Sequence, residues 1–156
     1  MKLCVIGGGG VRSMFLARSI AGRAAALGIQ TLVFMDNDAE KLKLFGGMAK
    51  HVAHVLAPHL QFVLTTDAQA AVTGADYVIT TIRVGGDAAR SRDEHIALRK
   101  GVLGQETTGA AGFSFAMRSI PVLLEYCALI REHAKPTVKV FNFTNPVGIV
   151  SQALRD

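Results

Sequence analysis

The sequence has no tryptophan, and its 156 residues include only eight phenylalanines and two tyrosines. It also has no block of like charge, although its formal net charge is +5. A surface on which nucleic-acid bases stack needs aromatic side chains beside a continuous basic stretch. We therefore expect no nucleic-acid partner, and the positive charge suits a small anionic ligand instead.

Cysteine is scarce, and no uninterrupted apolar run reaches 18 residues. The two cysteines, Cys4 and Cys127, lie far apart in apolar stretches, which favours reduced core residues over a disulfide. A membrane-spanning helix needs about 20 predominantly apolar residues, so we expect no membrane partner. Because the first predicted strand begins at residue 2, no room remains before it for a signal peptide, and we expect a cytoplasmic protein.

Linkers, internal repeats and low-complexity segments are absent as well. Half of the residues are hydrophobic and 19% are charged, as in globular rather than disordered chains. A length of 156 residues suits a single domain, which we expect to cover residues 1–156.

Short apolar stretches alternate with segments of helical spacing along the chain. We predict strands over residues 2–6, 31–35, 61–64, 76–81 and 137–143, and helices over 12–27, 39–56, 67–73 and 114–133, with a last helix after residue 148. This alternation predicts right-handed crossovers and an α/β fold, a Rossmann-like doubly wound parallel sheet in a single three-layer domain. Ligands of such sheets bind at the carboxyl ends of the strands.

Four consecutive glycines separate the first predicted strand from the first predicted helix. Glycines let the backbone approach a pyrophosphate, and the helix N-terminus presents N–H groups to its negative charge. Two of them fit the G-x-G-x-x-G fingerprint, whereas an arginine occupies the third glycine position. The alternative is a tight turn without a ligand, because glycine-rich turns are common. The residues that we expect to contact a dinucleotide here are Gly7, Gly9, Gly10, Val11 and Arg12.

A carboxylate, Asp36, follows the second predicted strand directly. At this position it can accept hydrogen bonds from both ribose hydroxyls, and it would repel a 2′-phosphate, which favours NAD over NADP. The alternative is that Asp36 or Asp38 caps the next helix, a role that we expect of Asp38.

The segment after the fourth predicted strand, residues 83–113, is polar and glycine-rich, which predicts a long irregular loop of functional importance. Its arginines suit a bidentate hold on phosphate or carboxylate, although a solvated surface charge is the alternative for each of them. We expect Thr81 and Arg83 at the same edge of the sheet as the glycine turn. Asn145 precedes Pro146, which biases it toward an extended backbone and predicts that its amide lies at this edge too.

Three blocks of the sequence resemble glycoside hydrolase family 4, the NAD- and metal-dependent glycosidases. They are Thr80-Thr81-Ile82-Arg83-Val84-Gly85-Gly86, Gly104-Gln105-Glu106-Thr107-Thr108-Gly109 and Asn142-Phe143-Thr144-Asn145-Pro146. The opening glycine run and the segment from Asp36 to Asp38 fit the same pattern, so the resemblance spans essentially the whole chain. The arginine after the fourth strand, Arg83, is more similar to the 6-phospho-β-glucosidase branch than to the α-glycosidase branch.

This resemblance implies a redox glycosidase that hydrolyses a phosphorylated disaccharide or β-glucoside. In the family, bound NAD oxidises the sugar at C3, a base removes the C2 proton, the aglycone is eliminated, and NADH reduces C3 again. The resemblance implies that Thr81 and Arg83 help to hold NAD, and that Arg83, Arg90 and Asn145 bind the phosphosugar. It implies a catalytic role for Glu106, which would tune the basicity of the catalytic tyrosine.

The resemblance also implies a divalent metal, manganese, as Lewis acid. The family's metal ligands and catalytic tyrosine lie beyond the last matching block, and neither Tyr77 nor Tyr126 corresponds to that base. His51 and His54 have a spacing that can bind a metal, but such pairs are more often the polar edge of a helix. We therefore expect no metal ligand in this chain, no catalysis by it alone, and self-association as a homo-oligomer through uncovered apolar surface.

Two other functions share the βαβ plan. A lactate/malate-type dehydrogenase domain would need a catalytic histidine elsewhere and no block like that around Gln105. The other alternative is a non-enzymatic NAD-binding or interaction module.

Overall fold

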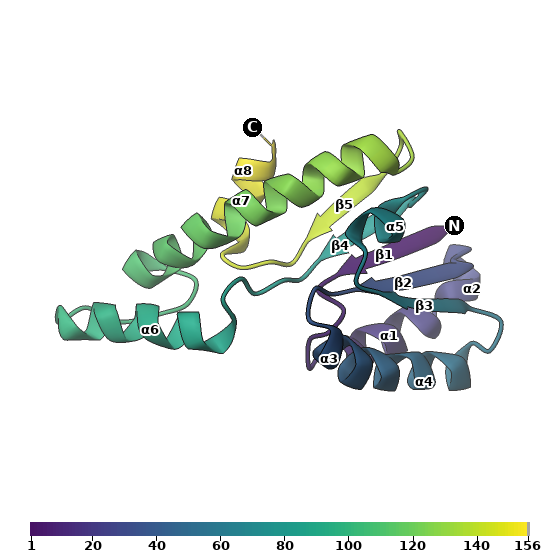
Figure 1. The fold of residues 1–156 in the computed structure, drawn as a ribbon, viewed down its shortest axis with the longest axis horizontal. Helices are drawn as coiled ribbons and strands as arrows, with labels where there is room; N and C mark the ends of the chain where they lie inside the picture. The colour runs from purple at the N-terminus through teal and green to yellow at the C-terminus, as the bar shows by residue number, and fades with distance from the viewer. Residues whose placement is uncertain (156) are drawn as a thin grey trace. The chain divides into compact units, whose positions relative to one another are not determined.

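The computed structural model describes residues 1–155, which contain a five-stranded sheet of order β3-β2-β1-β4-β5 (Figure 1). The strands are β1 (Lys2–Ile6), β2 (Thr31–Met35), β3 (Gln61–Thr65), β4 (Tyr77–Thr80) and β5 (Lys139–Asn142). Strand β1 pairs in parallel with β2 and β4, and β2 pairs in parallel with β3. The predicted Rossmann-like parallel sheet is therefore confirmed.

The described chain divides into two compact units. The first contains Met1–Thr80 and Leu129–Phe141, and the second contains Thr81–Ala128 and the residues from Asn142 onward. The sheet belongs to the first unit, apart from the last residue of β5.

Helices of the first unit are α1 (Ser13–Ala21), α2 (Ala24–Leu27), α3 (Ala39–Lys41), the π-helical η1 (Leu42–Gly46), α4 (Gly47–Leu56) and α5 (Ala68–Val72). The helix predicted over 12–27 is thus broken at Gly22, whose N–H group donates to Arg18 and ends α1. The helix predicted over 39–56 contains the π-helical segment. Gly28 ends α2 in the left-handed region, at φ 66°, as a C-terminal glycine is expected to do.

Small side chains let α1 and α4 pack together beneath the sheet, where Figure 1 shows them side by side. Ala17 and Ala21 of α1 and Ala49 and Ala53 of α4 are all buried, in one cluster with Phe34 of β2. Along the sheet, the chain moves in one direction from β1 through β2 to β3, and then returns past β1 in the opposite direction to reach β4. Right-handed crossovers therefore put α1 and α4 on one face and α5 on the opposite face.

The carboxyl ends of three adjacent strands are level. Ile6 is in register with Met35 on one side and with Thr80 on the other. The glycine turn, Asp36 and Thr81 each follow one of these residues in the chain.

The second unit holds α6 (Gly86–Arg99), most of α7 (Gly109–His133) and α8 (Val147–Arg155). The prediction of an irregular loop over residues 83–113 is wrong for residues 86–99, which form α6, and for residues 109–113, which belong to α7. The buried face of α6 consists of Ala89, Asp93 and Ala97, four residues apart. Because none of the three is a large apolar residue, the helix has no hydrophobic periodicity to detect.

Among the described residues, α7 is long and apolar enough to cross a membrane by length and composition alone. Core helices of soluble proteins pass the same test, so this is weak evidence for a span. Leu123 and Ile130 of α7 are buried, and Arg118 in the same helix forms an ion pair with Asp93.

Within residues 1–155 no disulfide joins Cys4 and Cys127. Cys4 is buried in the core as predicted, whereas Cys127 is only half-buried. Cys4 lies inside β1, and its burial raises the pKa of the thiol to about 12 despite the nearby Lys2. Such a thiol is protonated and unreactive at neutral pH.

Candidate functional site

The glycine turn is attached to the end of β2 by two backbone hydrogen bonds. The N–H groups of Gly7 and Gly8 both donate to the carbonyl oxygen of Met35, at 2.8 Å each. Gly7 has φ 101°, in the left-handed region that favours glycine. Beyond it, Gly10, Val11 and Arg12 are exposed at the start of α1. The turn therefore presents its backbone to solvent at the helix N-terminus, where an anion binds favourably.

Two glycines of the turn have no room for a side chain. A Cβ atom on Gly8 would lie 2.6 Å from Cβ of Phe34, and one on Gly9 would lie 2.8 Å from Oδ2 of Asp36. The buried hydroxyl of Ser13 donates to the carbonyl of Gly8 at 2.6 Å. The fingerprint singled out Gly7 and Gly9 and missed Gly8, because its constraint is a long-range contact that spacing does not show.

Asp36 is half-buried and accepts a hydrogen bond at each carboxylate oxygen. Gly9 N–H donates to Oδ2 at 2.9 Å, and Asp38 N–H donates to Oδ1 at 3.0 Å. Each oxygen keeps a lone pair for a further donor. The carboxylate is thus brought to the glycine turn, while its contact with a ribose stays a prediction.

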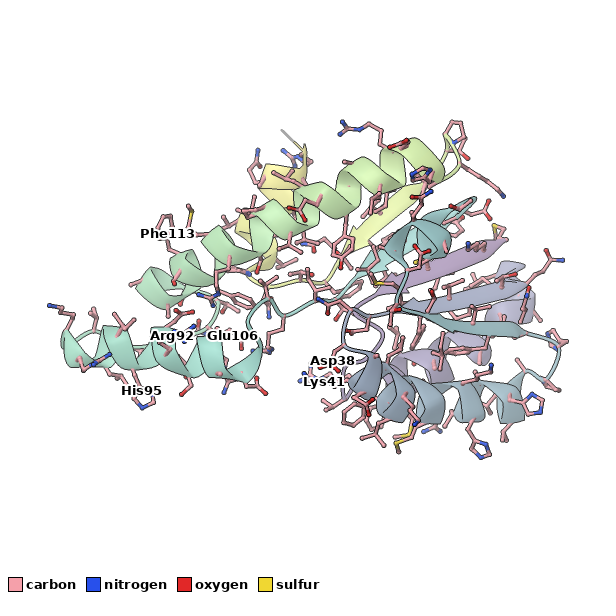
Figure 2. The ribbon with its side chains drawn as sticks, in the orientation of Figure 1. Asp38, Lys41, Arg92, His95, Glu106 and Phe113 are labelled. Carbon is pink, nitrogen blue, oxygen red and sulfur yellow. The ribbon has the colours of Figure 1, made fainter. Side chains whose placement is uncertain are left out.

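Asp38 caps α3, which confirms the alternative assigned to it. Its side chain accepts from the N–H of Lys41 at 3.0 Å and also forms an ion pair with that residue (Figure 2). The backbone hydrogen bond from Lys41 is the main reason why the pKa of Asp38 lies below its ordinary value.

In the second unit, Glu106 lies between two arginines. Its Oε1 atom is 2.9 Å from Nη1 of Arg83, and its Oε2 atom is 3.6 Å from Nη1 of Arg90. Figure 2 shows Glu106 beside α6. The structure therefore brings together three of the residues predicted for the phosphosugar site and its chemistry.

The Glu106 side chain is only 18% exposed, against 38% for Arg83 and 44% for Arg90. Its Oε1 atom is buried and accepts no aligned hydrogen bond, although Nη1 of Arg83 is close. The contact is thus an ion pair in which most donors of the guanidinium remain free for another anion.

Gln105 shapes the loop that carries Glu106. Its side-chain oxygen accepts from the N–H and hydroxyl of Thr107, at 2.7 and 2.8 Å, and from those of Thr108, at 2.9 and 3.1 Å. A Cβ atom on Gly104 would lie 2.5 Å from the carbonyl oxygen of Glu94, so the loop passes directly against α6. The family resemblance marks this block but assigns no role to Gln105, for which the flanking glycines are the available signal.

Thr144 connects the segment after β5 to the segment after β4. Its buried hydroxyl accepts from the N–H of Ile82 at 3.1 Å, and its own N–H donates to Asn142 Oδ1 at 3.0 Å. Asn145 is half-buried before a cis peptide bond to Pro146. Within residues 1–155 no hydrogen bond or ion pair joins Asn145 or Thr81 to the arginines, so both assignments stay predictions.

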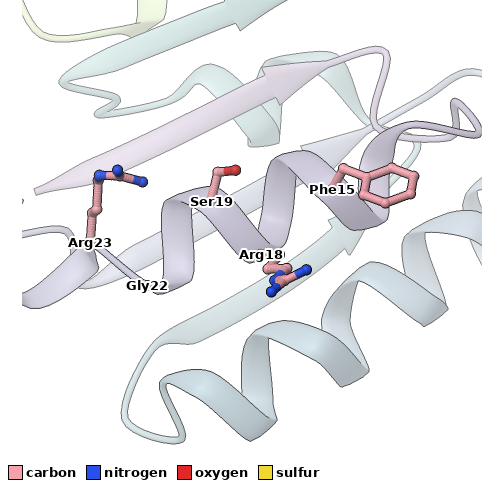
Figure 3. A pocket seen from close by; sticks show the side chains of 5 residues that line it. All are labelled: Phe15, Arg18, Ser19, Gly22 and Arg23. Atoms are coloured by element: carbon pink, nitrogen blue, oxygen red, sulfur yellow. The ribbon is translucent and has the colours of Figure 1, made fainter.

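A wide, open hollow of about 540 Å³ runs along α1. Phe15, Arg18, Ser19, Gly22 and Arg23 line it (Figure 3), and it contains none of the predicted site residues. In the part of the chain that the structure describes, no three His, Cys, Asp or Glu side chains are grouped so that they could hold a metal ion.

Residues 2–156 match the protein family described as Family 4 glycosyl hydrolase. The chain is 38% identical to a probable 6-phospho-beta-glucosidase of Bacillus subtilis and 36% identical to a 6-phospho-alpha-glucosidase of Leptotrichia buccalis, and in both cases 99% of this chain matches 35% of the relative. The chain thus spans about a third of the length of the curated relatives it matches.

A solved 6-phospho-beta glucosidase of Thermotoga maritima, with NAD and glucose-6-phosphate, superposes with a TM-score of 0.92 at 33% identity, over 100% of this chain and 37% of that chain. A malate dehydrogenase of Naegleria fowleri superposes with a TM-score of 0.67 at 16% identity. The second likeness shows the shared fold alone, so the dehydrogenase alternative gains no further support from it.

Proposed function

This chain belongs to glycosyl hydrolase family 4, and on that premise we propose that it is the NAD-binding N-terminal part of a 6-phospho-β-glucosidase. The observation that carries this proposal is the placement of Arg83 and Arg90 around Glu106, in a chain that opens with a dinucleotide turn. Relatives with α and β specificity are similar to the chain at about the same identity. The choice of β therefore rests on Arg83 in the segment after β4.

The residues present fit NAD. Gly8 and Gly9 pack so closely against Phe34 and Asp36 that neither position has room for a Cβ atom, which holds the turn beside the Asp36 carboxylate. The exposed backbone of Gly10, Val11 and Arg12 is placed for the pyrophosphate. The lone pairs that remain on Asp36 would accept hydrogen bonds from the adenosine ribose hydroxyls. Its negative charge would exclude the 2′-phosphate of NADP.

Bound NAD would supply hydride acceptance and return at the sugar C3 carbon. The chain's own contribution is to bind and orient the substrate. Arg90 and Arg83 would hold the phosphate of the sugar, and Asn145 would donate or accept at a hydroxyl. The ion pairs of Glu106 favour a role in holding these arginines over a role in tuning a catalytic tyrosine.

The described residues contain no cluster of side chains that could hold manganese, so this part of the proposal gives the metal no role. We place metal ligands and the catalytic base in the part of the family's length that this chain does not span. Residues 1–156 would therefore bind NAD weakly and leave the glycosidic bond intact. The same proposal includes a cytoplasmic location, a homo-oligomeric state, and a phosphorylated β-glucoside or disaccharide as substrate.

Calorimetry and an activity assay test this function. We expect NAD to bind the 156-residue chain with micromolar or weaker affinity, NADP to bind more weakly still, and Asp36→Ala to abolish binding of NAD. Release of p-nitrophenol from p-nitrophenyl-β-glucoside 6-phosphate, with NAD and manganese added, should be undetectable. Turnover by this chain alone, or NADP binding as tight as that of NAD, would contradict the proposal.

A further inference from the structure

A buried carboxylate that sequence analysis did not assign lies in the middle of α6. Asp93 is only 7% exposed, and it accepts hydrogen bonds from two residues of α7. Ser114 Oγ donates to Oδ1 at 3.0 Å, and Arg118 Nη2 donates to Oδ2 at 2.5 Å. Burial alone would raise the pKa of Asp93, but these hydrogen bonds outweigh it and hold the pKa below its ordinary value. Asp93 is therefore ionised and fixes the Arg118 guanidinium.

The guanidinium so fixed lies against an aromatic ring. Cζ of Arg118 is 5.7 Å from the centroid of the buried Phe115 ring. Cζ of Arg83 is 5.9 Å from the same centroid. Both distances are within the range of cation–π attraction, which is stronger where water is excluded.

Water is excluded on the inner side of this arrangement. Arg90, Asp93, Glu106, Ala111 and Phe115 line a narrow space that has no room for a water molecule. Arg83 contacts two of the side chains that line this space, the Phe115 ring and the Glu106 carboxylate.

We propose that Asp93 and Arg118 are positioning residues that act through Phe115 to hold Arg83 against Glu106. Their part in binding a phosphate-bearing sugar rests on the proposed function, whereas their hold on Arg83 does not. The chain of contacts runs from Asp93 to Arg118, to the Phe115 ring, and then to Arg83. Each link joins the neighbouring side chains directly.

Nuclear magnetic resonance on the 156-residue chain tests this directly, through hydrogen exchange of the arginine Nε–H groups. In the unchanged protein, Arg83 should exchange more slowly than Arg92, which is exposed on the same helix, α6, as Asp93. Phe115→Leu keeps Asp93 and Arg118 but removes the ring. It should speed exchange at Arg83 by about tenfold, as loss of a shielded cation–π contact would. It should change Arg118 less, because Asp93 and Ser114 still bind that guanidinium.

Arg118→Met should release Arg83 to a similar extent, and Arg118→Lys, which retains the charge opposite Asp93, should restore part of the protection. Arg83 exchange that is equal to that of Arg92 in the unchanged protein would overturn the proposal. So would unchanged Arg83 exchange in Phe115→Leu or Arg118→Met, even if the melting temperature fell, because Asp93 and Arg118 would then only join two helices. Added glucose 6-phosphate distinguishes the positioning role from the proposed function. Protection of Arg83 without any response to this sugar would support the positioning role and count against the proposed substrate.

Discussion

The two units of the molecule hold their carboxylates in different ways. In the first unit, Asp36 accepts from two backbone N–H groups in the turns that follow β1 and β2. In the second unit, Glu106 and Asp93 lie against arginine side chains. A backbone donor is placed by the fold itself, whereas an arginine must lose the freedom of several rotatable bonds to reach its partner. The first site is therefore set by the path of the main chain, and the second by side-chain contacts.

The largest effect should come from adding a side chain to the tightly packed glycine turn of the first unit. Gly8→Val would place a Cβ atom 2.6 Å from Phe34 Cβ in a fully packed position. Overpacking of this kind should lower the free energy of unfolding by about 3 kcal/mol. Urea denaturation followed by circular dichroism measures it, and calorimetry should show no binding of NAD.

Gly47→Ala is the matched control, because a Cβ atom there meets nothing within 4 Å and the residue is helical, at φ −61°. This substitution should raise the free energy of unfolding by about 0.5 kcal/mol. An equal loss of stability in both variants would show that the close approach to Phe34 is not what makes Gly8 sensitive.

A smaller loss is expected in the second unit, from removing the charge that Arg118 faces. Asp93→Asn keeps the shape of the side chain but leaves a guanidinium that is only 26% exposed without its counter-ion. The expected cost is about 2 kcal/mol in the same urea assay. A cost below that of an exposed ion pair would show that the second unit does not depend on this contact.

The pH dependence of stability follows from the same carboxylate. The pKa of Asp93 is lower in the folded protein than the value of about 3.9 in an unfolded chain. Its contribution is therefore complete above the unfolded pKa and is lost as the pH falls through the folded pKa. The unchanged protein should lose more stability than Asp93→Asn between pH 5 and pH 2, and parallel curves would contradict this assignment.

The contrast between the units also explains what could be predicted from sequence. The strands and the glycine turn of the first unit are visible because buried strands are continuous apolar runs and a helix cap such as Asp38 is a local signal. The break at Gly22 was missed because an isolated glycine can either lie within a helix or end one, and the helical spacing continues on both sides of it.

Helix α6 was missed because its buried face is not apolar. Its buried face contains Asp93 between two alanines, and the partner of Asp93 lies 25 residues along the chain, in α7. A residue that is buried by an ion pair resembles a surface residue in any pattern based on hydropathy. Arg83, Arg90 and Glu106 were singled out through the family resemblance, whereas their mutual contacts depend on how α6 and the loop after it pack.

Local hydrogen bonds to a side-chain oxygen offer a comparison between the units at a lower energy. Asp67 accepts from Ala70 N–H at 3.0 Å and caps α5 in the first unit. Gln105 receives four donors just before α7 in the second. Replacing either residue with alanine should cost about 1 kcal/mol in urea denaturation. Gln69→Ala, on an exposed site of α5, is the control and should cost little. A negligible effect of Gln105→Ala would mean that its four hydrogen bonds only exchange with water.

The smallest effect is expected at the outer side of Arg83. Its Nη1 atom is 3.6 Å from Oδ1 of Asp87, whose side chain is 87% exposed. Salt and water screen such a pair, so Asp87→Asn should change the free energy of unfolding by no more than about 0.3 kcal/mol. Glu106→Gln removes the shielded partner of the same guanidinium and should cost several times as much. Equal costs for the two variants, measured at low and high salt, would show that burial does not decide which carboxylate holds Arg83, and the distinction between the inner and outer sides of this site would fail.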